Sequence, residues 1–509
     1  MVARDWTIRG LRTAVAHGDV SARDVCETYL QRIGAANREL NALTVVLGDE
    51  ARAQAEEIDR HREMWADRPL LGVPITIKDV ICTRGTPTTA GSRILAGFKP
   101  PYDATVVTRL LDAGAVVVGK TNCDEFAMGS STEYSAYGPT RNPWALDHIP
   151  GGSSGGAAAA VAARLAAASI ASDTGGSIRQ PAALCGVVGL KPTYGRVSRY
   201  GLLAFASSLD QIGPMTLTVA DAAVVFQVIA GHDPCDATSA TEPVPDIDTG
   251  VPCDPKRARI GVPRGVLTDG VDPVVLHAFD EALTALTDRG ATLLEIDLPH
   301  MAYAVPVYYL VAPAEASSNL ARYDGVRYGF RAALRDEEGD LSAMYDQTRD
   351  QGFGPEVKRR IMLGTYALSA GYYDAYYVKA QRVRSLIRRD YDEAFAQVDA
   401  VAMPTTPSAA FRIGERIDDP LAMYLGDIFT VSANLTGLPA ISLPCGFTDT
   451  GLPIGFQLIG RPFDEATLFG LADAYERQVS WVTERPPAVP SSPSGRGGSS
   501  HERDNGPHE

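Results

Sequence analysis

Residues 150–156 read PGGSSGG, an alanine-rich segment follows, and residues 172–181 then read SDTGGSIRQP. In each stretch a glycine pair precedes a serine, Ser153 in the first and Ser177 in the second. Glycine pairs let the backbone adopt positive φ and approach a ligand closely. A serine behind such a pair is presented as a nucleophile would be, so the two stretches indicate a catalytic site.

A serine becomes a nucleophile only beside a base, and the best candidate in this sequence is a lysine. Residues 72–79 read GVPITIKD, in which two isoleucines alternate with Thr76 and Lys78. This alternation is typical of a strand and places the lysine on the face opposite the isoleucines. Lysine acts as a base only where burial lowers its pKa, and the flanking apolar residues favour burial. We therefore predict that Lys78 is the base and that Ser153 relays the proton from Ser177.

The second glycine pair also predicts an oxyanion hole, because consecutive N–H groups in such a turn can converge on one oxygen. The predicted donors are the backbone N–H groups of Thr174, Gly175, Gly176 and Ser177. A helix expected over residues 157–168 would place Ser153 near a helix N-terminus, where the dipole favours negative charge.

Each stretch has a simpler interpretation when it is taken alone. A GGSSGG run is a common flexible-loop composition, and a lysine at a strand end is usually a solvated charge. A phosphate loop is excluded, because the lysine and Ser/Thr that follow the glycines in that motif are absent. His148 is interpreted as a surface or loop-stabilising residue, since one imidazole without a matched acidic partner is weak evidence for catalysis. The three stretches together are far more specific.

Taken together, the stretches GVPITIKD, GGSSGG and DTGGSIRQPA resemble the amidase signature family. The resemblance implies that Ser177 forms the acyl ester, that Ser153 is a bridging serine in a cis peptide, and that Lys78 is the base. It further implies that Asp173 and Arg179 support the loop without taking part in the chemistry. Many relatives carry serine where this chain has an alanine after the second glycine pair, a departure that leaves the mechanism unchanged.

Longer stretches resemble one branch of this family, the A subunits of the Asp/Glu-tRNA amidotransferases, over roughly residues 5–485. Among them are DEFAMGSSTE, KPTYGRVSR, SSLDQIGP and GYYDAYY. The branch implies a site for free glutamine, in which Arg360 binds the α-carboxylate, Asp427 binds the α-ammonium and Tyr308 forms a hydrogen-bonding wall. The planar guanidinium of arginine matches a carboxylate well. Without the family, Arg360 would read as part of a solvated basic cluster and Asp427 as a surface carboxylate.

The branch therefore implies a glutaminase that supplies ammonia to companion B and C subunits. These partners would use ATP and Mg to amidate misacylated Glu-tRNA(Gln) or Asp-tRNA(Asn), while this chain would hold no cofactor and no metal. One alternative is a free-standing amidase, which would use the same catalytic residues but would not need an Arg/Asp pair. Another is a non-catalytic scaffold, which would not need Lys78, Ser153 and Ser177 together.

Composition limits the other classes of function. The chain has 509 residues, 45% of them hydrophobic, and a net charge of −15, which disfavours a broad nucleic-acid-binding surface. Seven cysteines without C-x-x-C spacing indicate a reduced, cytoplasmic protein without a zinc site. The sequence lacks both an apolar run long enough to span a membrane and a signal peptide.

Strand-length apolar runs alternate with helical segments, which predicts an α/β core with helices on both faces of a sheet. The resemblance implies the amidase-signature fold, with a large mixed central sheet. We expect one amidase domain over 1–485, with a helical, tyrosine-rich specificity segment at about 300–395, and a disordered tail over 486–509. The predicted strands are 74–81, 115–119, 187–190, 259–262, 291–296, 398–403, 440–444 and 454–459, and the predicted helices lie within 7–60 and at 157–168 and 272–289.

Overall fold

The computed structural model describes residues 7–247, 255–267, 270–333, 340–479 and 481–487. The tail predicted to be disordered lies outside these residues apart from its first two positions.

One mixed sheet of eleven strands organises the described residues, in the order β1-β3-β2-β4-β6-β5-β10-β11-β9-β7-β8. Strand β2 pairs in parallel with β3 and β4, and β7 pairs in parallel with β8 and β9, whereas the other pairs are antiparallel. The strands are β1 (Leu43–Val46), β2 (Pro74–Lys78), β3 (Val116–Thr121), β4 (Ala168–Asp173), β5 (Val188–Lys191), β6 (Gln211–Thr216), β7 (Arg259–Val262), β8 (Thr292–Glu295), β9 (Ala400–Pro404), β10 (Ala440–Phe447) and β11 (Pro453–Gly460). The predicted α/β class and mixed central sheet are confirmed.

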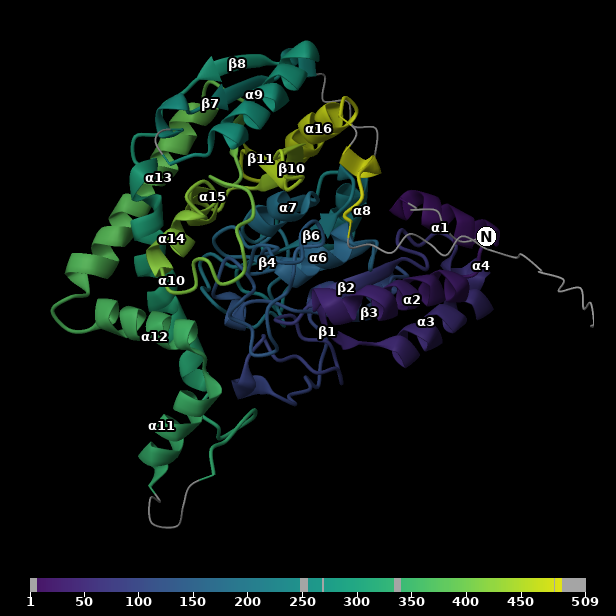
Figure 1. Cartoon of the computed structure of the whole chain (residues 1–509), viewed down its shortest axis with the longest axis horizontal. Helices are drawn as coiled ribbons and strands as arrows, with labels where there is room; N and C mark the ends of the chain where they lie inside the picture. Colours follow the sequence, from purple (N-terminus) through teal and green to yellow (C-terminus); the bar gives the residue numbers. More distant parts are fainter. Residues whose placement is uncertain (1–6, 248–254, 268–269, 334–339, 480, 488–509) are drawn as a thin grey trace, which may run out of the picture.

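Helices cover both faces of this sheet, as β9 illustrates. Val401 and Met403 pack in the core that also contains residues of α10 and α13, whereas the alternate residues Ala400 and Ala402 pack with residues of α9 and α16. In Figure 1 the N-terminal helices lie at one end of the molecule and α10, α12 and α13 at the other. The longer helices are α1 (Ile8–His17), α2 (Ala22–Leu40), α3 (Gly48–Arg60), α5 (Thr105–Asp112), α6 (Gly155–Ala162), α8 (Val219–Ile229), α9 (Pro273–Asp288), α10 (Ala304–Asn319), α11 (Leu341–Gly352), α12 (Pro355–Leu368), α13 (Lys379–Phe395) and α16 (Glu465–Glu476), and the shorter ones that bear on the site are α7 (Arg179–Cys185), α14 (Pro420–Leu425) and α15 (Val431–Thr436).

The parallel pairing of β2 with β4 brings the two catalytic stretches together. Ile75 lies opposite Ala168 and Ile77 opposite Ile170, so both strands end at the same edge of the sheet. Lys78 is the last residue of β2, and the serine-containing loops surround this edge.

The helix predicted over 157–168 is too long. It ends at Ala162, and the chain turns at Arg164, which has a positive φ of 59°, before entering β4. Alanine-rich sequence does not distinguish a buried helix from the approach to a buried strand, so periodicity alone does not locate this boundary. Strands β1, β4 and β6 are likewise absent from the predicted set.

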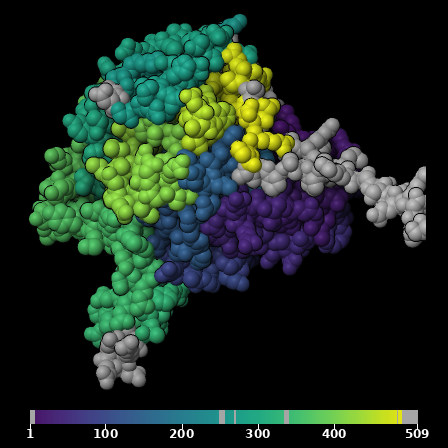
Figure 2. All heavy atoms as spheres, viewed as in Figure 1, coloured from purple at the N-terminus to yellow at the C-terminus, as the bar shows by residue number. Residues whose placement is uncertain are grey.

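The segment at about 300–395, whose role in specificity stays a prediction, contains α10, α11, α12, a π-helical turn over Asp374–Val378 and α13. Helix α11 projects from the body of the molecule, which the space-filling view in Figure 2 shows clearly. Helices α10 and α12 pack on each other and carry two of the predicted substrate-binding residues, Tyr308 and Arg360.

Candidate active site

Lys78 is fully buried, and its amine is surrounded by hydroxyl groups. Its Nζ lies 2.7 Å from Ser153 Oγ, 2.8 Å from Ser154 Oγ and 3.0 Å from Ser172 Oγ. None of the described carboxylates forms an ion pair with this amine, and burial lowers the pKa of Lys78 to about 8. About a tenth of the amine is therefore neutral at pH 7, far more than for an exposed lysine, and the predicted base requires this neutral form.

Ser154 and Ser172 are contacts that the sequence analysis did not single out. Ser154 accepts a hydrogen bond from Lys78 and donates one to the carbonyl oxygen of Ser172 at 3.1 Å. The doubled serine of GGSSGG and the serine before DTGGS were the available signals. These hydroxyls let the lysine lie in the interior without a carboxylate partner.

Ser153 is placed by its neighbours as the resemblance implies. The Gly152–Ser153 peptide is cis. The N–H of Gly152 donates to Gln180 Oε1 at 2.8 Å, and the carbonyl oxygen of Ser153 accepts from the N–H of Asp124 at 3.2 Å. The backbone on both sides of the Ser153 side chain is therefore fixed by hydrogen bonds from other segments.

Ser177 lies in the loop between β4 and α7, close to the serine pair. Its carbonyl oxygen accepts from the N–H of Ser154 at 3.3 Å, which ties the two glycine-rich loops together. Within the described part of the chain its hydroxyl forms no hydrogen bond, and the residue is 7% exposed. The direct Ser153–Ser177 proton step stays a prediction, while the hydroxyl that is expected to attack is free to meet a substrate.

Asp173 and Arg179 hold the loop that contains Ser177. The Asp173 carboxylate accepts from the N–H of Gly176 at 2.9 Å and from Arg179 Nε at 3.0 Å. Burial is the largest influence on the pKa of Asp173 and raises it, but the charge and hydrogen bond of Arg179, the charge of Lys191 and a hydrogen bond from Asn434 together lower it to about 2. These contacts fit the support role. Because Gly176 donates to Asp173, the oxyanion role falls to the N–H groups of Thr174, Gly175 and Ser177, and it stays a prediction.

The glycine pair in this loop is required by close neighbours. A Cβ on Gly175 would lie 2.6 Å from the ring of Tyr308. A Cβ on Gly176, which has a φ of +138°, would lie 2.3 Å from Thr430 Oγ1. The ring of Tyr308 therefore packs directly on the loop beside Ser177, which places the predicted wall next to the predicted nucleophile.

Arg360 lies in an aromatic enclosure next to Tyr308, so its interpretation as a solvated basic residue is wrong. It is 2% exposed, and its Nε donates to Glu356 at 2.8 Å. Its guanidinium carbon lies 5.2 Å from the ring centre of Tyr309 and 5.3 Å from that of Tyr424. Its terminal nitrogens have no hydrogen-bond partner among the described residues. Tyr309 and Tyr424 had no distinguishing signal in the sequence.

Asp427 is also buried, at 5% exposure, so its interpretation as a surface carboxylate is wrong too. It accepts a hydrogen bond from the hydroxyl of Ser130. Burial raises its pKa to about 7, while Ser130 and the Arg360 charge oppose the rise. The charges of Arg360 and Asp427 both act on Tyr308, so the three predicted substrate-binding residues lie in one neighbourhood.

A second buried lysine shows why Lys78 is the better base. Lys120 on β3 lies 3.6 Å from the carboxylate of Asp79 and donates to the carbonyl oxygen of Ile81 at 2.7 Å and to Thr88 Oγ1 at 2.8 Å. Burial lowers the pKa of Lys120, but the charge of Asp79 opposes the change. Lys120 thus has a carboxylate neighbour in Asp79, which Lys78 lacks among the described residues.

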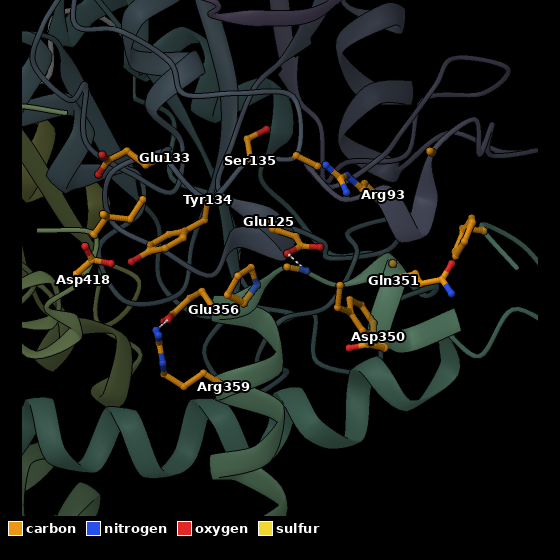
Figure 3. A pocket seen from close by; sticks show the side chains of 18 residues that line it. Arg93, Glu125, Glu133, Tyr134, Ser135, Asp350, Gln351, Glu356, Arg359 and Asp418 are labelled. Carbon is orange, nitrogen blue, oxygen red and sulfur yellow. Dashed lines mark hydrogen bonds and ion pairs between the residues drawn. The ribbon is translucent and has the colours of Figure 1, made fainter. Parts of the chain in front are cut away.

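A cavity of about 1120 Å³ adjoins the site (Figure 3). Glu356 lies between the site and this cavity. It forms an ion pair with Arg360 of the site and another with Arg359, which lines the cavity. The predicted catalytic and substrate-binding residues are not part of the cavity lining. The cavity is therefore a neighbour of the site.

Other residues that the sequence analysis considered lie outside the site. His148 does have an acidic partner, Asp147, at 2.7 Å, but Asp147 is exposed and neither residue contacts the catalytic serines.

The described residues contain no group of three His, Cys, Asp or Glu side chains placed to hold a metal ion. None of the helices in the described ranges is long and apolar enough to cross a membrane. All six described cysteines are free, as predicted.

Comparisons with known proteins agree with this geometry. A family model described as Amidase matches residues 24–469. The chain is 60% identical over 482 residues to the A subunit of the glutamyl-tRNA(Gln) amidotransferase of Chloroflexus aggregans, covering 94% of this chain and 98% of that protein. It is 56% identical over 477 residues to the protein of the same name from Koribacter versatilis, covering 94% and 99%.

Solved structures give the same result. The crystal structure of the A subunit of the glutamyl-tRNA(Gln) amidotransferase from Thermotoga maritima is 43% identical with a TM-score of 0.77, covering 96% of this chain and 98% of that one. The native peptide amidase from Stenotrophomonas maltophilia is 34% identical with a TM-score of 0.79, covering 95% and 99%. With the serines, the buried lysine and the fold in place, the chain belongs to the amidase signature family.

Proposed function

We propose that this chain is the glutamine-hydrolysing subunit of a tRNA-dependent amidotransferase. The observation that carries the proposal is the buried Arg360 and Asp427 beside Tyr308, which packs on the loop of Ser177. Free glutamine carries both a carboxylate and an ammonium, and a site selective for it needs a fixed cation and a fixed anion. Arg360 pairs with Glu356 through Nε alone, so an enzyme for neutral carboxamides has no reason to leave its terminal nitrogens and the Asp427 carboxylate open to a ligand next to the nucleophile.

The proposed reaction uses these groups in turn. Ser177 Oγ attacks the side-chain amide carbon of glutamine, and its proton passes through Ser153 to the neutral amine of Lys78. The tetrahedral oxyanion is stabilised by backbone N–H groups of the loop. Lys78 then returns the proton through Ser153 to the leaving nitrogen, the C–N bond breaks and ammonia departs. Water attacks the glutamyl ester by the same proton route, which releases glutamate and restores Ser177.

The companion steps belong to other chains in this proposal. The relatives carry amidotransferase names that include glutamyl-tRNA(Gln). We infer that B and C subunits, using ATP and Mg, activate misacylated Glu-tRNA(Gln) or Asp-tRNA(Asn) and consume the ammonia in a cytoplasmic heterotrimer. A net charge of −15 supports placing the tRNA on a partner.

The test is hydrolysis of glutamine compared with butanamide, which has the same amide but neither charge. We expect the chain to prefer glutamine and to release glutamate faster when B and C subunits, then ATP and misacylated tRNA, are added stepwise. A slow variant incubated with glutamine should carry a glutamyl ester on Ser177, detectable by mass spectrometry. Preference for butanamide, with no response to partners, would instead establish a free-standing amidase, and an ester on Ser153 or Ser154 would overturn the assigned roles.

A further inference from the structure

A continuous line of buried hydrogen bonds joins Asp427 to the catalytic serine. The hydroxyl of Ser130 donates to Asp427 Oδ2, the carbonyl oxygen of Ser130 accepts from Gln180 Nε2 at 2.9 Å, and Gln180 Oε1 accepts from the N–H of Gly152 at 2.8 Å. Gly152 precedes Ser153, whose hydroxyl accepts from Lys78. The side chains of Ser130, Gln180 and Asp427 are each at least 95% buried, and Ser153 is fully buried.

The orientation of Gln180 is fixed by its two neighbours. One partner is a carbonyl oxygen, which can only accept, and the other is a backbone N–H, which can only donate. The amide therefore cannot be reversed without breaking both bonds. Because the amide of Gln180 has one orientation, a shift of Ser130 would move Gln180 and, through it, the backbone of Gly152.

Asp427 has a second, independent connection to the site. The hydroxyl of Thr430 lies 3.0 Å from the carbonyl oxygen of Asp427 and 2.6 Å from that of Gly175, in the proposed oxyanion loop. The side chain of Asp427 thus contacts Ser130, and its backbone is tied through Thr430 to the loop of Ser177. Without a ligand, this carboxylate accepts a hydrogen bond from one group among the described residues, the hydroxyl of Ser130. A bound ammonium would add a second partner, of opposite charge, and would therefore alter the contacts of this carboxylate strongly.

We propose that Ser130 and Gln180 are positioning residues that couple the binding of the glutamine ammonium at Asp427 to the placement of Ser153 beside Lys78. The inference rests on the proposed function, because it assigns the ammonium to Asp427. An ammonium draws the carboxylate into one position, Ser130 follows because it donates to that carboxylate, and Gln180 then holds the backbone of Gly152. Catalysis would be fastest when the substrate carries the ammonium. An amide without the ammonium would be hydrolysed slowly although it reaches Ser177.

The test compares two substrates that differ only in this group: glutamine and glutaramic acid, the monoamide of glutaric acid, which lacks the α-ammonium. Rates are measured at about pH 8, above the pKa of about 7 of Asp427 and below the pKa of the α-ammonium of free glutamine, so that the carboxylate is mostly ionised while the substrate keeps its charge. In Ser130→Ala, kcat on glutamine should fall about tenfold, the effect of one strong hydrogen bond, while kcat on the monoamide changes less than about twofold. Ser442→Ala, which removes an equally buried hydroxyl that contacts Thr405, serves as the control and should leave both rates unchanged.

Two variants of Gln180 separate positioning from folding. Gln180→Glu keeps the acceptor for Gly152 but loses the donor to Ser130, so it should reproduce the glutamine-specific loss. Gln180→Leu loses both bonds and should slow both substrates. Equal losses on both substrates in Ser130→Ala, or a change in KM with kcat preserved, would overturn the coupling while leaving the glutaminase proposal intact. A wild-type preference for the monoamide would refute the glutaminase proposal itself.

Discussion

The proposed catalytic centre and the proposed glutamine clamp, formed by Tyr308, Arg360 and Asp427, differ in how completely the protein satisfies its own polar groups. At the catalytic centre, the Lys78 amine is within hydrogen-bonding distance of three hydroxyls, and the Asp173 carboxylate is saturated by Arg179 and backbone N–H groups. In the clamp, the terminal nitrogens of Arg360 and the hydroxyl of Tyr308 have no partner within the described residues. The difference indicates that the base and the loop support are pre-organised, whereas the clamp, like the free hydroxyl of Ser177, is completed by a ligand.

The two regions also come from different parts of the fold. Lys78 and Asp173 end parallel strands that lie side by side in the sheet, so their positions are set by strand pairing. Tyr308 and Arg360 lie on α10 and α12, and Asp427 follows α14. A scaffold of paired strands with a helical wall allows substrate preference to change without disturbing the nucleophile.

The largest effect is expected from a substitution that impairs the catalytic centre alone. Lys78→Arg keeps the positive charge but cannot lose its proton near neutral pH, so we expect kcat to fall about 10³-fold on glutamine and on butanamide alike. Lys120→Arg is the matched control, because Asp79 needs a cation there and not a base, and it should retain activity within about tenfold. Folding is checked by thermal unfolding. An active Lys78→Arg variant would mean that the proton goes elsewhere.

A smaller effect is expected from a substitution that impairs the clamp alone. Arg360→Ala should weaken kcat/KM for glutamine by about 1.5–3 kcal/mol, the contribution of a charged hydrogen bond, and should barely change that for butanamide. Arg360→Lys keeps the charge but not the planar fork, so its loss should be intermediate. Steady-state kinetics on both substrates checks this prediction. Equal losses would show that Arg360 supports the fold through Glu356 and does not bind glutamine.

The catalytic side was predictable from sequence because its signals are local. Lys78, Ser153 and Ser177 each lie within a short stretch whose glycines or alternation carry meaning without any long-range contact. Ser154 and Ser172 were not predicted to be site residues although they lie in the same stretches. Three hydroxyls surround the Lys78 amine only when β2 and β4 are paired. Their roles depend on register, which the sequence does not state.

The clamp was predictable only through the family resemblance. Taken alone, Arg360 in a KRR run and Asp427 in an ordinary loop indicate surface charges. Both are buried, and the rings of Tyr309 and Tyr424 enclose Arg360. Burial of this kind depends on helices that are distant in sequence. The boundary between α6 and β4 escapes prediction for a related reason, because small residues pack equally well in a buried helix and a buried strand.

The pH dependence should separate the two regions by substrate. The pKa of Lys78 is lowered to about 8, and the amine is a base only when neutral, so kcat on any substrate should rise about tenfold per pH unit below 8 and level off above it. The pKa of Asp427 is raised to about 7, and only the ionised carboxylate attracts an ammonium. The KM for glutamine should therefore rise as pH falls below 7, and the KM for butanamide should not. Identical pH profiles for both substrates would contradict the assignment of Asp427.

The smallest expected effect lies at the boundary between the two regions. Tyr308 packs on Gly175 with both its ring and its hydroxyl, and the charges of Arg360 and Asp427 act on it, so it lies between the two regions. Tyr308→Phe keeps the packing and removes the hydroxyl, and it should lower kcat/KM for glutamine by about 0.5–1.5 kcal/mol without affecting butanamide. Tyr308→Ala also removes the ring from the loop beside Ser177, so it should lower kcat on both substrates and reduce the thermal stability. If Tyr308→Phe is as damaging as Tyr308→Ala, the hydroxyl acts on the reacting atoms, and the division between the catalytic centre and the clamp fails at this residue.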